Sequence, residues 1–325
     1  MERSKYIRNK IVVLILVSVM LVLSIGGSST YYASDDNTII TNSEKSVGLY
    51  RYEVSTGKVT TLDKDEAIKT NSQQQEYREQ GAESVPEIVP DGLSSNPPSD
   101  STMRGLLGSW TAINPATGGQ YRNTVHLSVT KGGKTGQATG FMIGPNAVAT
   151  CGHVIYSDGN YATNIVATPA RANSSAPYGT ASATDYIMNT GWINDGDTEY
   201  DWGIILLDAN IGDNVGYLGL RWQSASYNNK SIMINGYPGK VGNNTSNKVM
   251  YRSNGKISES KTRLLYSTDT NADGGMSGGP VYFYSSDTGY TAIGLIRGGN
   301  SSKNTFVRIT QEVYDLFVSY RNSRV

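Results

Sequence analysis

Short apolar runs separated by turn-forming residues fill the chain between residues 125 and 308. Several alternate apolar and polar positions, as in residues 125–129 (VHLSV), which is the pattern of a strand with one buried face. Glycine and asparagine recur between the runs and favour turns. The pattern predicts two sets of about six strands: 125–130, 140–143, 148–150, 165–168, 186–188 and 203–207, then 232–237, 248–253, 263–267, 281–284, 292–296 and 305–308. Dense short strands of this kind predict an all-β barrel or sandwich.

The last segment of the chain has a different period. Val313, Leu316, Phe317 and Tyr320 recur at helical spacing, and Thr310 precedes them as an N-cap. We therefore expect a C-terminal α-helix whose apolar stripe docks on the sheet.

Composition fits an extracellular β-rich protein. The 325 residues include 22 Tyr and 36 Gly but only 10 Pro, as expected for tyrosine-rich strands joined by many turns. Cys151 is the single cysteine, so no internal disulfide can form and the fold must rely on its core.

The first hundred residues have the composition of targeting and processing segments. Residues 1–34 read as a signal peptide, with four Lys or Arg before the apolar run at 11–25, which is short for a membrane span. An uncleaved anchor is the alternative. Residues 35–101 read as an acidic, largely irregular propeptide: residues 35–100 carry 13 acidic and 6 basic side chains, against 14 and 18 in residues 101–325. Opposite net charges favour association of the two parts, and a solvated linker is the other interpretation.

The segment 274–280 (GGMSGGP) presents a serine between glycines. Glycines permit positive φ and bring backbone N–H groups close to a reacting atom. Ser277 in such a turn can attack a carbonyl if a base accepts its proton and N–H groups hold the oxyanion. This motif predicts a nucleophilic serine that needs a histidine and an acid elsewhere in the chain.

Only two histidines can serve as the base. His126 lies on one face of an alternating strand, which favours a structural role, whereas His153 follows an apolar strand at the opening of a loop. Asp201 directly precedes the apolar run 203–207, so its carboxylate should be partly buried and need a partner such as an imidazole N–H. Asp208, at the other end of that run, is followed by turn residues and is expected to be solvated.

Around these three residues the chain resembles the chymotrypsin-like serine proteases. Among those proteases it most resembles the secreted glutamyl endopeptidases of Gram-positive bacteria. The order His153, Asp201, Ser277 is that of chymotrypsin. The segments 139–145, 177–179, 215–217, 236–239 and 308–310 also resemble that group. The resemblance covers residues 105–325 and implies two six-stranded antiparallel barrels of the trypsin-like fold, formed by residues 102–325, with the site between them.

The resemblance also implies the role of each residue. Ser277 would be the nucleophile, His153 the general base and then acid, and Asp201 the group that orients the imidazole. The N–H groups of Gly275 and Ser277 would form the oxyanion hole. A thiol nucleophile at Cys151 is the weaker alternative, since a small buried cysteine is usually inert.

The predicted substrate pocket departs from the glutamyl endopeptidases. Their pocket histidine and threonine correspond here to Ile296 and Ala272, so both carboxylate partners are missing. Arg297, beside Gly298 and Gly299, could bind an acidic P1 side chain, although its neighbour Ile296 places it on the other face of the strand. Asn271 and Asp273 would instead favour a basic P1 residue, and a small or apolar preference is the third possibility. Met276 stands where polar residues are usual in this fold, without affecting the chemistry.

The remaining expectations concern partners and cofactors. We expect polypeptide substrates and the chain's own propeptide as partners of a secreted monomer. Either the enzyme itself or an activating protease cuts after Asp100 or Arg104. The catalytic part has a small, unclustered positive charge, so no nucleic acid is expected, and no stable membrane association after processing. We predict no cofactor: two His and one Cys make no zinc set, and only residues 195–197 offer a weak calcium candidate. A catalytically silent binding homologue is the competing functional class.

Overall fold

The structure is a computed structural model that describes residues 48–63, 77–79, 81–93, 110–114, 116–241 and 248–325. The predicted signal peptide and the two expected activation bonds lie outside these residues.

Residues 124–207 form a closed barrel. Its strands are β6 (Thr124–Lys131), β7 (Lys134–Met142), β8 (Ala147–Thr150), β10 (Asn160–Pro169), β11 (Ala181–Asn189) and β12 (Gly203–Leu207). They pair antiparallel in the order β10-β11-β12-β8-β7-β6, and β6 pairs with β10 again to close the ring. Alternation along β6 turns Val125, Leu127 and Val129 into the core. The predicted six-stranded barrel is confirmed here.

The second half forms a second sheet. Its ladder runs β17 (Leu264–Ser267), β20 (Asn304–Arg308), β19 (Gly289–Gly299), β18 (Pro280–Ser285), β14 (Ser231–Gly236) and β15 (Met250–Lys256). Side chains bridge its two ends: the Asp269 carboxylate accepts the Lys256 N–H at 2.9 Å, and the Ser253 hydroxyl accepts the Asn271 N–H at 2.9 Å. Six strands therefore surround the second core, joined at one seam by side chains instead of a backbone ladder.

Several shorter elements were not predicted from the pattern. They are β5 (Thr111–Ile113), β9 (Tyr156–Ser157), β13 (Gly219–Gln223), β16 (Glu259–Ser260), the helices α3 (Gly152–Ile155), α4 (Thr190–Asp195) and α5 (Gly212–Val215), and the 3-10 turns Gly119–Tyr121 and Thr198–Tyr200. Strand β13 runs parallel to β19. The short helix α3 matters most, because it carries His153 where the sequence led us to expect a loop.

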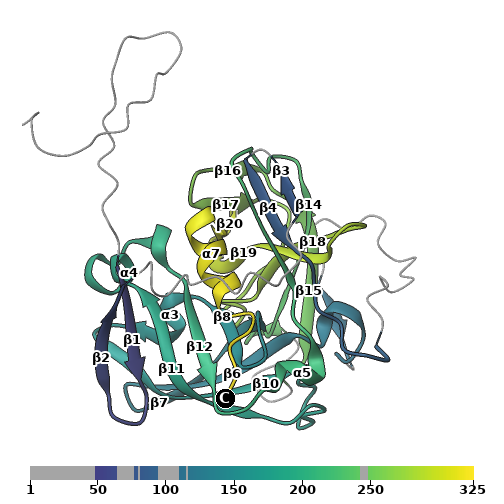
Figure 1. The fold of residues 1–325 in the computed structure, drawn as a ribbon. Coiled ribbons are helices and arrows are strands. Elements are labelled where there is room, and N and C mark those ends of the chain that lie inside the picture. Colours follow the sequence, from purple (N-terminus) through teal and green to yellow (C-terminus); the bar gives the residue numbers. More distant parts are fainter. Residues whose placement is uncertain (1–47, 64–76, 80, 94–109, 115, 242–247) are drawn as a thin grey trace, which may run out of the picture. The chain divides into compact units, whose positions relative to one another are not determined.

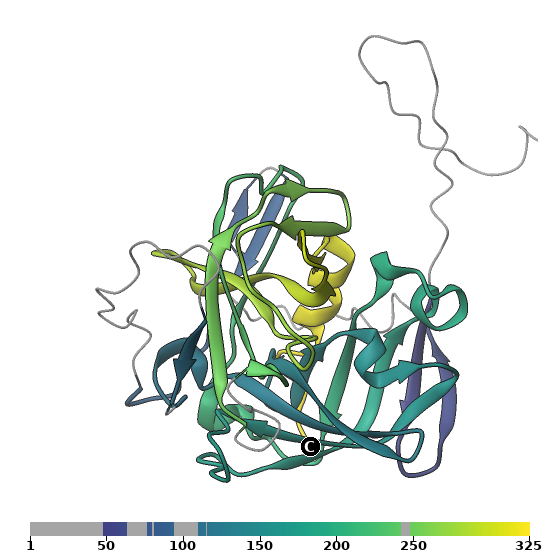
Figure 2. The same cartoon turned by 180° about the vertical axis from the view of Figure 1, so that it is seen from behind.

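Helix α7 (Gln311–Ser319) ends the fold. The Thr310 hydroxyl accepts the Val313 N–H at 3.5 Å, as expected of the predicted N-cap. Figures 1 and 2 show α7 between the two groups of strands. Its Phe317 ring meets the buried Trp202 ring edge-on at 6.2 Å, so the helix packs against the residue that follows Asp201.

In the part of the chain that the structure describes, no helix is both long and apolar enough to cross a membrane.

The predicted propeptide contributes four strands that the sequence analysis missed. They are β1 (Leu49–Glu53), β2 (Lys58–Leu62), β3 (Tyr77–Glu79) and β4 (Ala82–Val85). Strand β1 extends the first sheet through β11, and β4 extends the second through β13. The sparse apolar residues of this segment predict a largely irregular chain, and that prediction is wrong. Its strands form by pairing with edges that the rest of the chain supplies.

Candidate active site

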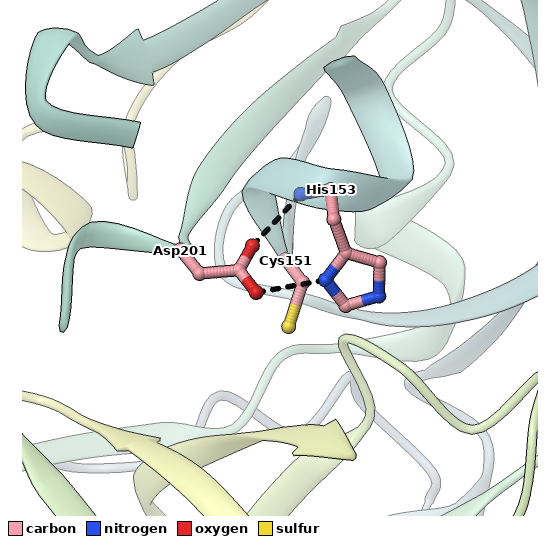
Figure 3. A group of neighbouring side chains, drawn as sticks. All are labelled: Cys151, His153 and Asp201. Atoms are coloured by element: carbon pink, nitrogen blue, oxygen red, sulfur yellow. Dashed lines mark hydrogen bonds and ion pairs between the residues drawn. The ribbon is translucent and has the colours of Figure 1, made fainter. Parts of the chain in front are cut away.

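His153 and Asp201 are brought together by two neighbouring strands. His153 lies on α3 directly after β8, and Asp201 lies directly before β12, while β8 and β12 pair with Gly203 opposite Thr150. Asp201 Oδ2 lies 2.8 Å from His153 Nδ1, and Asp201 Oδ1 accepts the His153 backbone N–H at 2.8 Å (Figure 3). The carboxylate thus holds both the ring and the backbone of the same residue. With Nδ1 donating to the carboxylate, Nε2 is the ring nitrogen left to accept a proton.

Asp201 has no exposed surface, whereas the His153 side chain is 30% exposed. A buried carboxylate needs compensation, and a second cation supplies it: Arg297 Nε lies 3.2 Å from Asp201 Oδ2. The sequence had placed Arg297 in the substrate pocket, facing away from Ile296. Its side chain does turn away from Ile296, and it meets the carboxylate that holds the histidine. The sequence around Asp201 does not indicate this contact, because Asp201 and Arg297 are 96 positions apart in the chain.

Ser277 lies on the loop that leads into β18, and both halves of the fold fix that loop. Within it, Met276 donates its N–H to Asp273 at 3.0 Å and buries its side chain in the second core. From β7 of the first barrel, the Thr139 N–H donates to the Ser277 carbonyl at 3.0 Å and the Thr139 hydroxyl to the Gly275 carbonyl at 2.8 Å. Thr139 is a positioning residue that lies in a motif we had quoted only for its resemblance.

His153 and Ser277 line one pocket of about 250 Å³, together with residues from β6 and β7. The Ser277 hydroxyl lies 3.5 Å from the Arg297 carbonyl, and among the described residues it makes no hydrogen bond to His153. Catalytic hydrogen bonds are often long without substrate and tighten when substrate binds. The fold therefore places the His153 imidazole and the Ser277 hydroxyl in one pocket without a hydrogen bond between them.

The glycines around Ser277 are required by close backbone approaches. Gly275 has φ +99°, and a Cβ there would lie 2.4 Å from the Tyr237 carbonyl oxygen. Gly278 has φ +85°, and a Cβ there would lie 2.0 Å from Thr150 Oγ1. Within the described chain, the N–H groups of Gly275 and Ser277 have no hydrogen-bond acceptor, which is the state that oxyanion donors need before substrate arrives.

The five residues predicted to bind substrate do not line this pocket. Ile296 is fully buried in the second core, against which the partly buried Ala272 packs, and Arg297 is directed to Asp201. Gly299 could not carry a side chain, since a Cβ would lie 2.3 Å from Asn304 Oδ1, whereas the space at Gly298 is open. Their part in substrate selection stays a prediction.

Cys151 and His126 have the properties of structural residues. The Cys151 thiol is fully buried and donates to the Ile296 carbonyl at 3.1 Å. Burial first, and then the Asp201 charge, raise the pKa of this thiol well above its usual value, which disfavours the thiolate that a nucleophile needs. Burial, and then the charges of Arg171 and Lys248, lower the pKa of His126 to about 3, so this imidazole is neutral.

The chain belongs to the trypsin family, whose family model, described as Trypsin, matches residues 111–317. It is a serine endopeptidase of that family. It is 36% identical over 234 residues to the glutamyl endopeptidase of Bacillus licheniformis, covering 68% of this chain and 71% of the relative. It is 40% identical over 210 residues to the extracellular metalloprotease of Bacillus subtilis, covering 63% of this chain and 65% of the relative.

Two solved structures share the fold. A Glu endopeptidase in complex with MPD has a TM-score of 0.58 and 26% identity, covering 66% of this chain and 96% of its own. The protease Anisep from Arthrobacter nicotinovorans has a TM-score of 0.56 and 23% identity, covering 66% of this chain and 100% of its own. The predicted trypsin-like fold is thereby confirmed.

One relative is called a metalloprotease, and a metal site would need several ligand atoms close together. Of the described residues, Cys151, His153 and Asp201 alone form a group whose ligand atoms lie within 4.8 Å of one another. Their chemistry does not fit a cation: the thiol is held protonated and donates to Ile296, and the carboxylate already meets the guanidinium of Arg297. At the weak calcium candidate, residues 195–197, the Asp197 carboxylate accepts the Glu199 N–H at 3.0 Å.

Proposed function

We propose that this enzyme hydrolyses peptide bonds through Ser277, His153 and Asp201. One observation carries the proposal: a fully buried carboxylate holds both the ring and the backbone N–H of a histidine that shares a pocket with Ser277. This arrangement leaves Nε2 of His153 facing the reaction as a base.

The proposed reaction has two stages. Ser277 Oγ attacks the scissile carbonyl while its proton passes to His153 Nε2, and the Gly275 and Ser277 N–H groups hold the oxyanion. His153 then gives that proton to the leaving amine as the carbon–nitrogen bond breaks, which leaves an ester on Ser277. Water attacks the ester with His153 again as base, releasing the acid and restoring the hydroxyl. Asp201 stays ionised throughout and stabilises the imidazolium.

An acidic P1 residue is the finer proposal. The relative named glutamyl endopeptidase supports it, whereas Ala272 and Ile296 offer no partner for a carboxylate and Arg297 is engaged by Asp201. Three peptides that differ only in Glu, Lys or Ala at P1 test this preference. The highest kcat/KM for Glu supports it. The highest value for Lys points to Asn271 and Asp273, and the highest value for Ala points to a small apolar pocket.

We further propose that the enzyme is secreted as a preproenzyme. The relative named an extracellular metalloprotease and the charged, then apolar, first 34 residues support export. Intact mass of the exported protein tests both the removal of residues 1–34 and that of residues 35–101.

Labelling with a fluorophosphonate separates an enzyme from a silent binding homologue, because only an activated serine reacts. Peptide mapping of the labelled protein should place the label on Ser277, and Ser277→Ala should abolish it. Ser286→Ala, at an exposed serine just beyond the other end of β18, is the matched control and should label normally. A folded wild-type protein that is not labelled, or is labelled elsewhere, would overturn the proposal.

A further inference from the structure

We propose that the described residues 48–63, 77–79 and 81–93, here together called the clamp segment, fasten the two halves of the protease together and leave its active site open. This inference rests on the proposed removal of residues 35–101 by cleavage. A propeptide can block the active site as a plug or support the fold as a scaffold, and the clamp segment has the contacts of a scaffold.

On the first half, the clamp segment extends the sheet along the part of β11 that β10 leaves unpaired. Strand β1 pairs with β11 along its whole length, from Leu49 opposite Asn189 to Glu53 opposite Asp185. Leu49 is 2% exposed and belongs to the main core. Arg51 Nε donates to Asp185 Oδ1 at 2.8 Å.

Aromatic stacking adds to this contact. The Tyr52 ring stacks on Tyr161 at 4.1 Å and on Tyr186 at 5.7 Å, both from the first barrel. Aromatic pairs stabilise such contacts beyond the area they bury.

On the second half, strand β4 pairs with β13, with Val85 opposite Leu220. Val85 has no exposed surface and lies in the same core as Leu49. Beyond β4, Ile88 and Tyr217 exchange two backbone hydrogen bonds of 2.9 and 3.1 Å. Without the clamp segment, β11 and β13 would present unpaired backbone groups and the core would open at two places.

A buried arginine is also satisfied by the clamp segment. Arg321, which follows α7, is fully buried and donates to the carbonyls of Leu218 at 2.7 Å and Pro86 at 2.6 Å. Loss of Pro86 would remove an acceptor from a buried cation, which is costly. The clamp segment is thus integrated with the end of the chain as well as with both sheets.

None of the described residues of the clamp segment lines the pocket of His153 and Ser277. Its contacts lie on β11, β13 and their neighbours instead. We therefore expect the clamp segment to remain bound after the chain is cut, and the cut protein to be reactive while it is bound.

The test uses the whole secreted chain with a site for a specific protease inserted between Pro98 and Ser99. Ser277→Ala prevents self-digestion in the binding arm, in which the cut protein is passed through a size-exclusion column. Co-elution of the clamp segment with the protease part at neutral pH supports the proposal. Elution of the two as separate species in native buffer overturns it.

A second arm measures fluorophosphonate labelling of wild-type Ser277 after cutting, before and after the clamp segment is removed with mild denaturant. Equal labelling rates before and after removal of the clamp segment support an open active site. Labelling only after removal would show that the segment is a plug and would overturn that part of the proposal. If Ser277 is not labelled in any form, the proposed function fails while the co-elution arm still tests the clamp.

Val85→Asp tests the contact itself, because a charge would enter the core. We expect the cut segment to bind at least about 100-fold more weakly. Val59→Asp, on the outer strand β2 where Val59 is 45% exposed, is the control and should leave binding unchanged. If Val85→Asp does not fold, the co-elution of the cut wild-type chain still decides the question.

Discussion

Arg297 Nε lies 3.2 Å from Asp201 Oδ2, so the carboxylate that holds His153 also faces a permanent positive charge. Lys131 adds a second cation nearby, since its ammonium donates to the His153 carbonyl at 2.6 Å, and burial is the main cause that lowers the pKa of this lysine. These charges offset part of the attraction that Asp201 exerts on an imidazolium.

Removing the Arg297 charge should change how activity depends on pH. In Arg297→Met the charge that opposes an imidazolium beside Asp201 is lost, so we expect the acidic limb of kcat/KM to move to higher pH. Arg297→Lys, which keeps a charge, should move it less. An unchanged limb, or one that moves down, would contradict an electrostatic link between Arg297 and the triad. Peptides that differ at P1 should keep their ranking, because this side chain faces Asp201.

Asp201→Asn should lower kcat by about 10⁴-fold with little change in KM, because an amide in place of the carboxylate favours the wrong tautomer of His153. Single-turnover kinetics with a P1-matched ester measures this. Asp208→Asn is the control at the other end of β12, where the exposed Asp208 carboxylate accepts the Ser182 N–H at 2.9 Å. Equal losses in both variants would argue for a structural effect.

Gly275→Ala should lower kcat by about 10²–10³-fold, the usual effect of losing an oxyanion donor. A Cβ at this position would lie 2.4 Å from the Tyr237 carbonyl oxygen, and φ is +99°, so the loop must move. Gly274→Ala is a close control, because a Cβ there meets nothing within 4 Å. Activity retained in Gly275→Ala with a normal melting temperature would contradict the requirement for glycine at this position.

Binding of the clamp segment should weaken as pH rises. Burial raises the pKa of Glu87 from 4.5 to about 7, although a backbone hydrogen bond from Tyr290 and the charge of Arg122 act in the opposite direction. The docked carboxyl therefore holds its proton where the released one has lost it. Binding should be strongest below about pH 4.5, weaken between pH 4.5 and 7, and level off above.

Isothermal titration of the cut chain at several pH values measures this effect. Glu87→Gln should flatten the curve and bind more tightly than wild type at pH 8. A pH slope that persists in Glu87→Gln would assign the effect to another group.

Local chemistry determined much of what could be predicted from the sequence. The alternation of apolar residues predicted the six main strands of each half, and the apolar stripe after Thr310 predicted α7. Both patterns depend on neighbours only a few positions apart. The glycines around Ser277 and the acid before a buried strand likewise selected the three candidate residues.

Tertiary structure decided what depends on distant segments. The strands of the clamp segment form because β11 and β13 offer unpaired backbone groups. The sequence predicts Arg297 in the substrate pocket, and the fold instead places its side chain against Asp201. A strand at a sheet edge and an ion pair between remote residues are both stabilised by partners that lie far away in the sequence. Sequence therefore named the candidate reacting groups, and folding decided what surrounds them.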